Sequence, residues 1–252
     1  MKLEDIHKIA DIGEAELAEI EKLTPEAMVR FAFENFGKKA AIGTSFQLTG
    51  AVIVDMAAAA GLPFRVFTVD TLRLHPETYA AMNETETRYK VKVERFAPKE
   101  DKVKEMTEEF GEYLFFTSKA MQEYCCNVRK VEPNERAMAT LDVWITGLRK
   151  DQSEHRKKSV ERASIVEDGG RKILKLVPLA DWTEADVKKY IKENNVPYNE
   201  LFDKGYDSIG CVICSTPLVK GEKPRSGRWR WFSQDDAKEC GIHTRKGGSK
   251  GK

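Results

Sequence analysis

Strand-like and helix-like segments alternate along most of this chain, and that order admits few folds. Each short apolar stretch typical of a buried strand is followed by a longer stretch with helical patterning. The expected strands are 38–45, 64–70, 91–97, 142–147 and 172–178, and the expected helices are 23–37, 49–61, 75–90, 99–111, 118–140 and 183–195. Repeated β-then-α order predicts an α/β fold with a mostly parallel sheet flanked by helices on both faces.

Composition divides the chain into three regions. Residues 1–24 are expected to form an N-terminal helical segment, and residues 25–200 the α/β domain, whose first helix has Thr24 as N-cap. Asp181 or Thr183 is expected to cap the last helix of that domain. Residues 201–252 are rich in Gly, Pro, Trp and basic residues, and they predict an irregular C-terminal arm with a disordered tail.

Charge and cysteine content narrow the function classes. The chain has 42 basic and 41 acidic residues, which gives no reason to expect nucleic-acid or membrane binding. The acidic, amphipathic start is unlike a secretory or transit peptide. We therefore expect a cytoplasmic, reducing location, where the five cysteines bind metal, act in catalysis or stay inert rather than form disulfides.

Polar residues follow the first, second and fourth expected strands. The stretches are "GTSFQ" at 43–47, "TVDTLRLHPET" at 68–78 and "TGLRKDQSEHRKK" at 146–158. Each alone is compatible with an ordinary polar loop. In a parallel sheet, however, the carboxyl ends of the strands lie at one edge, where ligands bind. Together, the small residues, hydroxyls and cations predict a site for a phosphorylated, anionic ligand.

The cysteines form two pairs and one single residue. Cys125 and Cys126 are adjacent in "YCCNVRK", and Cys211 and Cys214 form a C-x-x-C in "CVIC". Four thiolates suit an iron–sulfur cluster, although zinc binding and no metal remain alternatives on the residues alone. The fifth, Cys240, lies in "AKECGIH" on a basic segment, where it is either a nucleophile or an incidental thiol.

Several motifs in order resemble one enzyme family. They are "VDTLRLHPETY", "YCCNVRKVEP", "TGLRKDQSEHR", "PLADWTEADV", "NNVPYNELFDKGYDSIGC", "RSGRWRWF" and "ECGIH". On these motifs, the chain resembles the assimilatory adenylyl-sulfate (APS) reductases, iron–sulfur relatives of the phosphoadenylyl-sulfate (PAPS) reductases. The adjacent cysteine pair with the distant C-x-x-C is the cluster-binding signature of that branch.

The resemblance implies a fold, a cofactor and a reaction. The fold would be adenine nucleotide α-hydrolase-like (Rossmann-like), with residues 25–200 binding the nucleotide. A [4Fe-4S] cluster would be held by Cys125, Cys126, Cys211 and Cys214. Cys240 would attack the sulfur of APS, release AMP and become an S-sulfocysteine. A separate thiol carrier, thioredoxin or glutaredoxin-like, would then release sulfite.

The resemblance also implies the residues that bind substrate. Around the phosphosulfate and the nucleotide it places Ser45, Asp70, Thr71, Lys130, Arg149, Arg156, Arg225, Arg228 and His243. Within this set, Lys130 is expected to link the cluster to the sulfonate. A homo-oligomer is expected.

Three other functions stay open. PAPS is an alternative substrate, because Lys and Arg are abundant in the arm. In addition, "SFQLTG", "STPL" and "GRWRWF" depart from the "SFGAED"-like turn, the "TRP" and the "GRWWWE" of many relatives. An adenylate-forming enzyme, such as a tRNA-thiolation protein, expects an "SGGxDS"-like turn that the chain lacks. A non-catalytic iron–sulfur sensor of sulfur nucleotides would not need Cys240.

Overall fold

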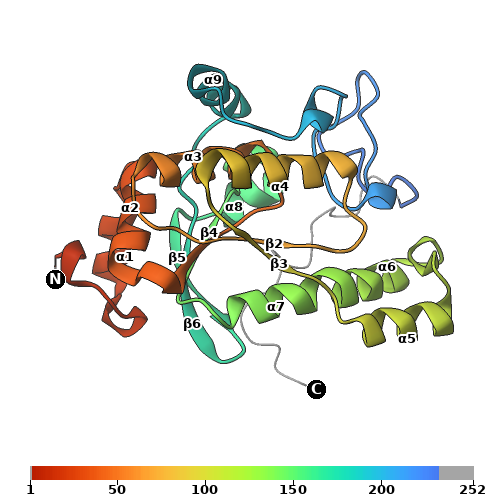
Figure 1. Cartoon of the computed structure of the whole chain (residues 1–252), viewed down its shortest axis with the longest axis horizontal. Coiled ribbons are helices and arrows are strands. Elements are labelled where there is room, and N and C mark those ends of the chain that lie inside the picture. The colour runs from red at the N-terminus through yellow and green to blue at the C-terminus, as the bar shows by residue number, and fades with distance from the viewer. Residues whose placement is uncertain (1, 233–252) are drawn as a thin grey trace.

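One six-stranded sheet forms the centre of the protein. The computed structural model describes residues 2–232, and all structural statements below concern that part of the chain. The strands are β1 (Ala40–Gly43), β2 (Val66–Val69), β3 (Val93–Phe96), β4 (Val143–Thr146), β5 (Ala163–Asp168) and β6 (Arg171–Leu176). Their order across the sheet is β3-β2-β1-β4-β6-β5 (Figure 1). The predicted α/β fold is confirmed.

Five strands are parallel and the sixth is not. β1 pairs with β2 and β4, β2 with β3, and β4 with β6, all in parallel. β5 pairs antiparallel with β6 through a tight turn at Gly169 and Gly170, both with positive φ. The sequence analysis did not predict β5, because its "ASIVED" mixes charged and apolar residues at a half-buried edge.

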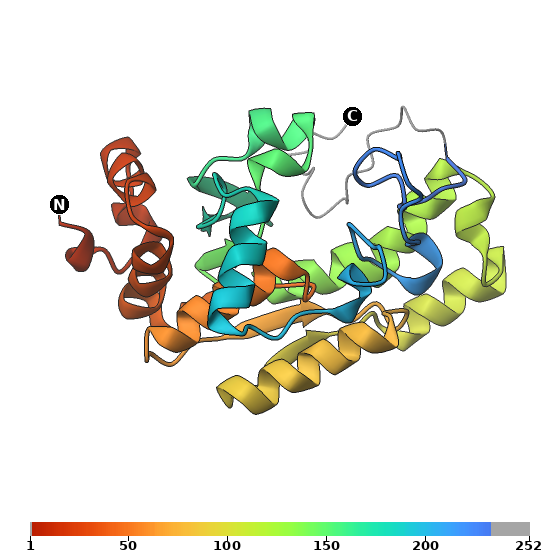
Figure 2. The same cartoon turned by 90° about the horizontal axis from the view of Figure 1, so that it is seen from above.

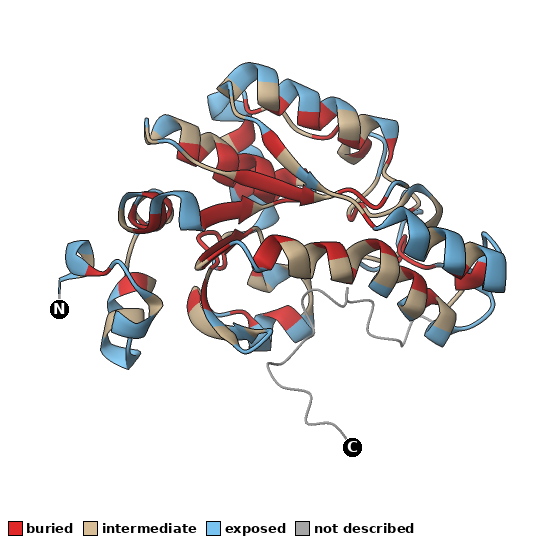
Figure 3. Cartoon of the chain, turned by 60° about the horizontal axis from the view of Figure 1, so that its bottom comes forward, coloured by how far each residue is buried: buried red, intermediate tan, exposed pale blue. Residues whose placement is uncertain are grey.

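Helices cover both faces of the sheet. They are α1 (Glu14–Glu21), α2 (Pro25–Phe36), α3 (Leu48–Ala59), α4 (Pro76–Tyr89), α5 (Glu100–Phe110), α6 (Lys119–Cys126), α7 (Glu132–Met138), α8 (Glu154–Ser159) and α9 (Glu184–Asn194). In Figure 1, α4 and α9 lie above the strands and α6 and α7 below them, and Figure 2 shows the same helices from above. Buried side chains of α2, α3, α4 and α9 form the larger core with one face, and those of α7 form a smaller core with the other. The strands of the centre are almost entirely buried (Figure 3).

Capping residues define the helix starts. The Thr24 hydroxyl accepts a hydrogen bond from the Ala27 backbone N–H and caps α2, as predicted. Thr183 caps α9 in a capping box with Asp186, so Thr183 is the cap rather than Asp181. The expected helix 118–140 consists of α6, a π-helical turn at Asn127–Val131, and α7. π-turns in helices often occur at functional sites.

The two ends of the described chain differ in character. The N-terminal segment contains two 3₁₀ turns, Leu3–Asp5 and Ile9–Asp11, and α1, and it packs on the domain through fully buried Ile6 and Ile20. Beyond residue 200 the described chain is irregular, with 3₁₀ turns at Glu200–Phe202 and Val212–Cys214. No helix between residues 2 and 232 is long and apolar enough to cross a membrane.

One carboxylate ties three helices together. Asp55 on α3 accepts hydrogen bonds from the Tyr89 hydroxyl of α4 at 2.8 Å and from the Tyr190 hydroxyl of α9 at 3.0 Å. Burial and these bonds raise the pKa of both tyrosines well above its usual value. The bonds therefore fix the relative positions of the helices on one face of the sheet.

Removing that carboxylate should destabilise the fold. We expect Asp55→Ala to lower the free energy of unfolding by about 2–3 kcal/mol, because two half-buried hydroxyls lose their acceptor. Chemical denaturation measures this change. The matched control is Glu84→Ala on the exposed face of α4, which should change the free energy by less than about 0.5 kcal/mol. Equal effects of the two variants would contradict the bridging role of Asp55.

Candidate active site

A cavity of about 440 Å³ lies at the carboxyl ends of the parallel strands. Its walls come from the turn after β1, the end of β2, the loop after β4 and the arm beyond residue 200. The cavity therefore occupies the edge where the sequence predicted an anionic ligand. Of the predicted site residues, Ser45, Thr71, Lys130, Arg149, Arg156, Arg225 and Arg228 line it. Cys240 and His243 lie outside the described residues.

The turn after β1 is built for close approach. Ser45 lines the cavity, and its hydroxyl accepts a hydrogen bond from the Gln47 side chain at 2.8 Å. A side chain at Gly50, in the first turn of α3, would meet the Thr44 hydroxyl at 2.1 Å. Only glycine at residue 50 allows the turn to fold back onto the helix. The amino-terminal end of α3 also lines the cavity, where helix N–H groups favour an anion.

Asp70 and Thr71 have different positions at the end of β2. Thr71 faces the cavity. Asp70 is buried and does not line the cavity. Its carboxylate accepts hydrogen bonds from the Leu72 backbone N–H at 2.9 Å and from the Tyr79 hydroxyl at 2.7 Å. Burial and the bond to Asp70 raise the pKa of Tyr79 to about 12. Asp70 thus shapes the turn that presents Thr71.

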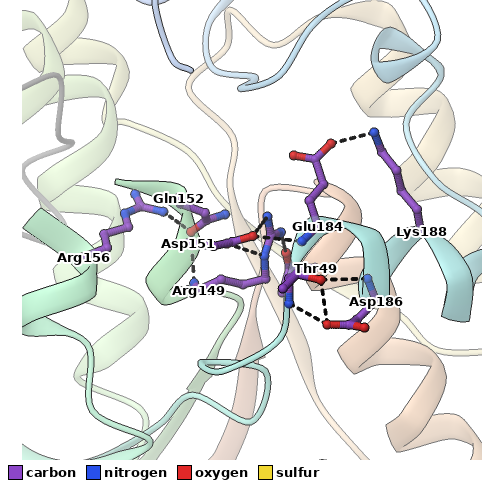
Figure 4. Close-up of polar contacts among 9 residues, drawn as sticks. Thr49, Arg149, Asp151, Gln152, Arg156, Glu184, Asp186 and Lys188 are labelled. Atoms are coloured by element: carbon purple, nitrogen blue, oxygen red, sulfur yellow. Dashed lines mark hydrogen bonds and ion pairs between the residues drawn. The ribbon is translucent and has the colours of Figure 1, made fainter. Parts of the chain in front are cut away.

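Arg149 is held in place by its neighbours in the loop after β4. Its guanidinium donates to the Thr49 hydroxyl of α3 at 2.7 Å and to the Asp151 carboxylate at 2.9 Å (Figure 4). Asp151 also accepts the backbone N–H of Glu184 at 2.8 Å, at the start of α9. Arg149 therefore joins β4, α3 and α9 at the rim of the cavity, and part of its charge is neutralised by Asp151.

Arg156 is positioned by the same loop. The Gln152 side-chain oxygen accepts hydrogen bonds from the Arg149 backbone N–H at 3.0 Å and from the Arg156 guanidinium (Figure 4). Ser153 caps α8, which carries Arg156. Arg156 is buried, so its side chain is held in place by the short helix that carries it and does not move freely in solvent.

The arm contributes two arginines that converge on one hydroxyl. Arg225 and Arg228 both donate to the Ser208 hydroxyl, at 3.2 and 3.3 Å. Arg228 also donates to the Cys214 carbonyl at 3.2 Å and lies over the Trp229 ring at 4.5 Å. A side chain at Gly210 would meet the Arg228 guanidinium at 2.3 Å. The arm therefore packs around the Arg228 guanidinium and fixes it in the cavity wall.

All four paired cysteines line one smaller cavity. It has a volume of about 20 Å³ and adjoins the larger one. Cys125 and Cys126 end α6, Cys211 precedes the 3₁₀ turn at Val212–Cys214, and Cys214 ends it. All four are free thiols. Five residues line both cavities: Thr71, Cys126, Lys130, Cys211 and Cys214.

The polar groups around the thiols suit sulfur ligands. The Gln122 amide donates to the Cys126 sulfur at 3.0 Å, and the Thr71 hydroxyl lies 3.2 Å from the Cys211 sulfur. Arg129 is buried, and its guanidinium donates to the Thr71 carbonyl at 3.2 Å. Its buried Nε atom has no hydrogen-bond partner in the described chain. Such a donor fits an anionic group in the cavity.

Burial and positive charge act in opposite directions on the thiols. Burial raises the pKa of the Cys125 thiol, whereas the Arg73 and Arg129 charges lower it. Burial and the neighbouring Cys211 raise the pKa of Cys214 to about 12. Among the described residues, no three His, Cys, Asp or Glu side chains are grouped so as to hold a metal ion. The observations that bear on a cluster are therefore the shared cavity, the sulfur-directed donors and the surrounding cations.

Sequence reasoning did not identify several residues of the site. Gln122 contributes through its hydrogen bond to Cys126, Ser208 through those from Arg225 and Arg228, and Gly210 through the close approach of Arg228. Arg73 and Arg129 contribute through charge. The only sequence signal for Gln122 was its spacing of four residues before Cys126 on an expected helix. Nothing in the sequence indicated the roles of Ser208 and Gly210, because both roles depend on how the arm folds.

Known proteins resemble the chain over most of its length. Residues 39–217 match the phosphoadenosine phosphosulfate reductase domain. The adenosine 5′-phosphosulfate reductase of Burkholderia cepacia is 40% identical, over 81% of this chain and 80% of the relative. That of Neisseria meningitidis serogroup A is 37% identical, over 94% of this chain and 96% of the relative.

Solved structures agree with the fold. Phosphoadenylyl-sulfate reductase of Candida auris superimposes with a TM-score of 0.68 at 30% identity, covering 82% of this chain and 98% of that one. FMN adenylyltransferase of Candida glabrata has a TM-score of 0.54 at 16% identity, covering 88% and 72%, and supports the fold alone. The predicted adenine nucleotide α-hydrolase-like fold is confirmed. The chain belongs to the phosphoadenosine phosphosulfate reductase family.

Proposed function

We propose that the protein reduces adenosine 5′-phosphosulfate (APS) to sulfite and AMP in sulfate assimilation in the cytoplasm. The observation that carries the proposal is the junction of the two cavities, where Lys130 lies between the cation-lined cavity and the four cysteines. The curated relatives named adenosine 5′-phosphosulfate reductase support it, at 37–40% identity.

The reaction has two steps on Cys240. In the first, the Cys240 thiolate attacks the sulfur of APS, a sulfur–sulfur bond forms, and the bond to the phosphate oxygen breaks to release AMP. In the second, a thiolate of the carrier attacks the Cys240 sulfur and sulfite leaves with the bonding electron pair. The carrier's second thiol then resolves the mixed disulfide. The two electrons thus come from the dithiol.

The cavity residues would bind the charges of this substrate. Arg225 and Arg228 would face the phosphosulfate oxygens, and the first turn of α3 with Ser45 would bind phosphate. Arg149 and Arg156 would lie beside the nucleotide, together with Thr71 at the end of β2. Asp70 acts in this proposal through the turn that it holds. His243 would bind near the sulfonate, and no described contact bears on it.

The four cysteines would hold a [4Fe-4S] cluster. Four thiolates in one cavity fit the ligand requirement, and the Gln122 amide, Arg129 and Arg73 would offset the negative charge of the assembly. The group would supply an electrostatic and organising charge rather than electrons. Lys130 lines both cavities and would hold the sulfonate beside the cluster.

PAPS is the second candidate substrate. The solved structure with a TM-score of 0.68 is titled a PAPS reductase, and the cavity is rich in cations that suit an additional phosphate. A comparison of kcat/KM for APS and PAPS separates the two. A clear preference for PAPS would reverse the assignment.

Gly210 should control the position of Arg228. We expect Gly210→Ala to lower kcat/KM for APS roughly 100-fold, because the added methyl group displaces the guanidinium from the cavity wall. Steady-state kinetics measures this loss. Lys220→Ala, an exposed change in the same arm, is the control and should leave kcat/KM unchanged. A Gly210→Ala enzyme with full activity would show that Arg228 does not act on substrate.

Cys240 should carry the reaction. We expect Cys240→Ser to abolish sulfite release, and wild-type protein mixed with radiolabelled APS to carry label on Cys240 that reduced thioredoxin removes. Peptide mapping locates the label. Label on Cys211 or Cys214 would refute the mechanism. A Cys240→Ser protein that still releases sulfite would refute the role of Cys240. Wild-type protein that binds APS but releases no sulfite with reduced thioredoxin would favour the non-catalytic sensor.

Iron binding should depend on the paired cysteines alone. Anaerobic protein should contain about four irons per chain, from the four ligands. We expect Cys211→Ser to lose most of this iron, whereas Cys240→Ser, a matched loss of one thiol, keeps it. Iron analysis and the visible absorption spectrum measure both. A finding of stoichiometric zinc and no iron would show that the four cysteines bind zinc instead of a cluster.

A further inference from the structure

Exposed apolar side chains gather around the four-cysteine cavity. The large hydrophobic side chains that are exposed in the described chain are Leu72, Phe110, Tyr113, Phe116, Val212 and Val219. Four of them lie near cavity-lining residues: Leu72 follows Thr71, Phe116 follows Phe115, and Val212 follows Cys211. The Tyr113 ring lies 6.1 Å from the Phe115 ring, centre to centre. Such a concentration is unusual on a soluble surface and marks an interaction site.

Hydrogen bonds and a cation–ring contact join these segments into one surface. The Val212 backbone N–H donates to the Arg73 carbonyl at 2.8 Å. The Arg73 guanidinium donates to the Glu112 carbonyl at 3.1 Å and lies 5.3 Å from the centre of the Phe115 ring. Arg73 therefore joins the segments that carry Leu72, Val212, Tyr113 and Phe116, and we call these four residues the apolar face.

Leu72 has a backbone conformation that leucine rarely adopts. Its φ is +58°, in the left-handed region that favours glycine and asparagine, and its side chain is 51% exposed. The strained backbone therefore does not bury the Leu72 side chain against the described part of the chain. An outlier of this kind at the rim of a site supports a functional role for the exposed side chain.

The apolar face adjoins the origin of the segment that carries Cys240. Phe116 packs against Trp231, with ring centres 4.5 Å apart, and the Trp231 indole donates to the Phe115 carbonyl at 3.1 Å. Cys240 follows Phe232 by eight residues, which span at most roughly 30 Å when fully extended. A protein that attacks a sulfur on Cys240 therefore works within about that distance of Phe232, whose neighbour Trp231 packs on Phe116.

We propose that the apolar face is the docking surface for the dithiol carrier that releases sulfite from Cys240. The inference rests on the proposed function. A carrier must bind, exchange a disulfide and leave in every turnover, and a patch of four side chains suits a small, transient contact better than a stable dimer. A carrier whose reactive thiol lies in an apolar surface would bury Leu72 and Tyr113 while that thiol reaches the Cys240 sulfur.

The test separates the carrier from the chemistry. The double variant Leu72→Asn/Tyr113→Ser removes two exposed apolar side chains, and asparagine tolerates the left-handed conformation at residue 72. We expect the KM for reduced thioredoxin to rise about tenfold. AMP release in a single turnover without carrier, and turnover with dithiothreitol, should match wild type. Val219→Ser, which removes the most exposed of the six side chains at a site away from the cavity, is the matched control and should keep the wild-type KM.

Three results would overturn the inference. One is a wild-type KM for thioredoxin in the double variant. Another is an equal loss with thioredoxin and dithiothreitol, which would indicate damage to the site. The third is a shift to a smaller assembly in sedimentation, which would assign the apolar face to contact between copies of this chain. Failure of wild-type protein to release AMP from APS would instead refute the proposed function.

Discussion

A short backbone pairing between the segment after β2 and the arm holds the site together. Leu74 and Cys211 form an antiparallel bridge, and the Val212 N–H donates to the Arg73 carbonyl at 2.8 Å. This pairing brings Cys211 and Cys214 beside Cys125 and Cys126, although the two pairs are far apart in the chain. The same pairing closes the larger cavity, because the arm that it anchors carries Arg225 and Arg228.

The two cavities form one electrostatic unit in this account. Cations of the β4 loop and the arm line the larger cavity, and buried Arg129 with Arg73 lies beside the thiols. Lys130 is the one cation among the five residues that line both cavities, so in the proposed function it would couple a change of charge at the cysteines to a bound sulfonate. Thr71 also lines both cavities, and its hydroxyl contacts Cys211 while its carbonyl accepts a hydrogen bond from Arg129.

Periodicity and strand-end chemistry predicted the fold and the edge at which the cavity lies. They failed where a residue acts through one tertiary contact. β5 was missed because a mixed polar strand at a sheet edge has no strong pattern. Asp70 does not line the cavity and holds the turn and Tyr79, and Arg149 lines the cavity while Thr49 and Asp151 hold its guanidinium. Spacing in the sequence does not reveal these hydrogen-bond partners, since the bonds depend on how separate loops meet in the fold.

The central claim is that one chain with its thiol carrier converts APS to sulfite and AMP. The most direct measurement is anaerobic incubation of the protein with APS and reduced thioredoxin, with sulfite, AMP and oxidised thioredoxin quantified together. The account predicts one sulfite and one AMP for each thioredoxin disulfide formed. AMP without sulfite, or no consumption of APS under these conditions, would contradict it.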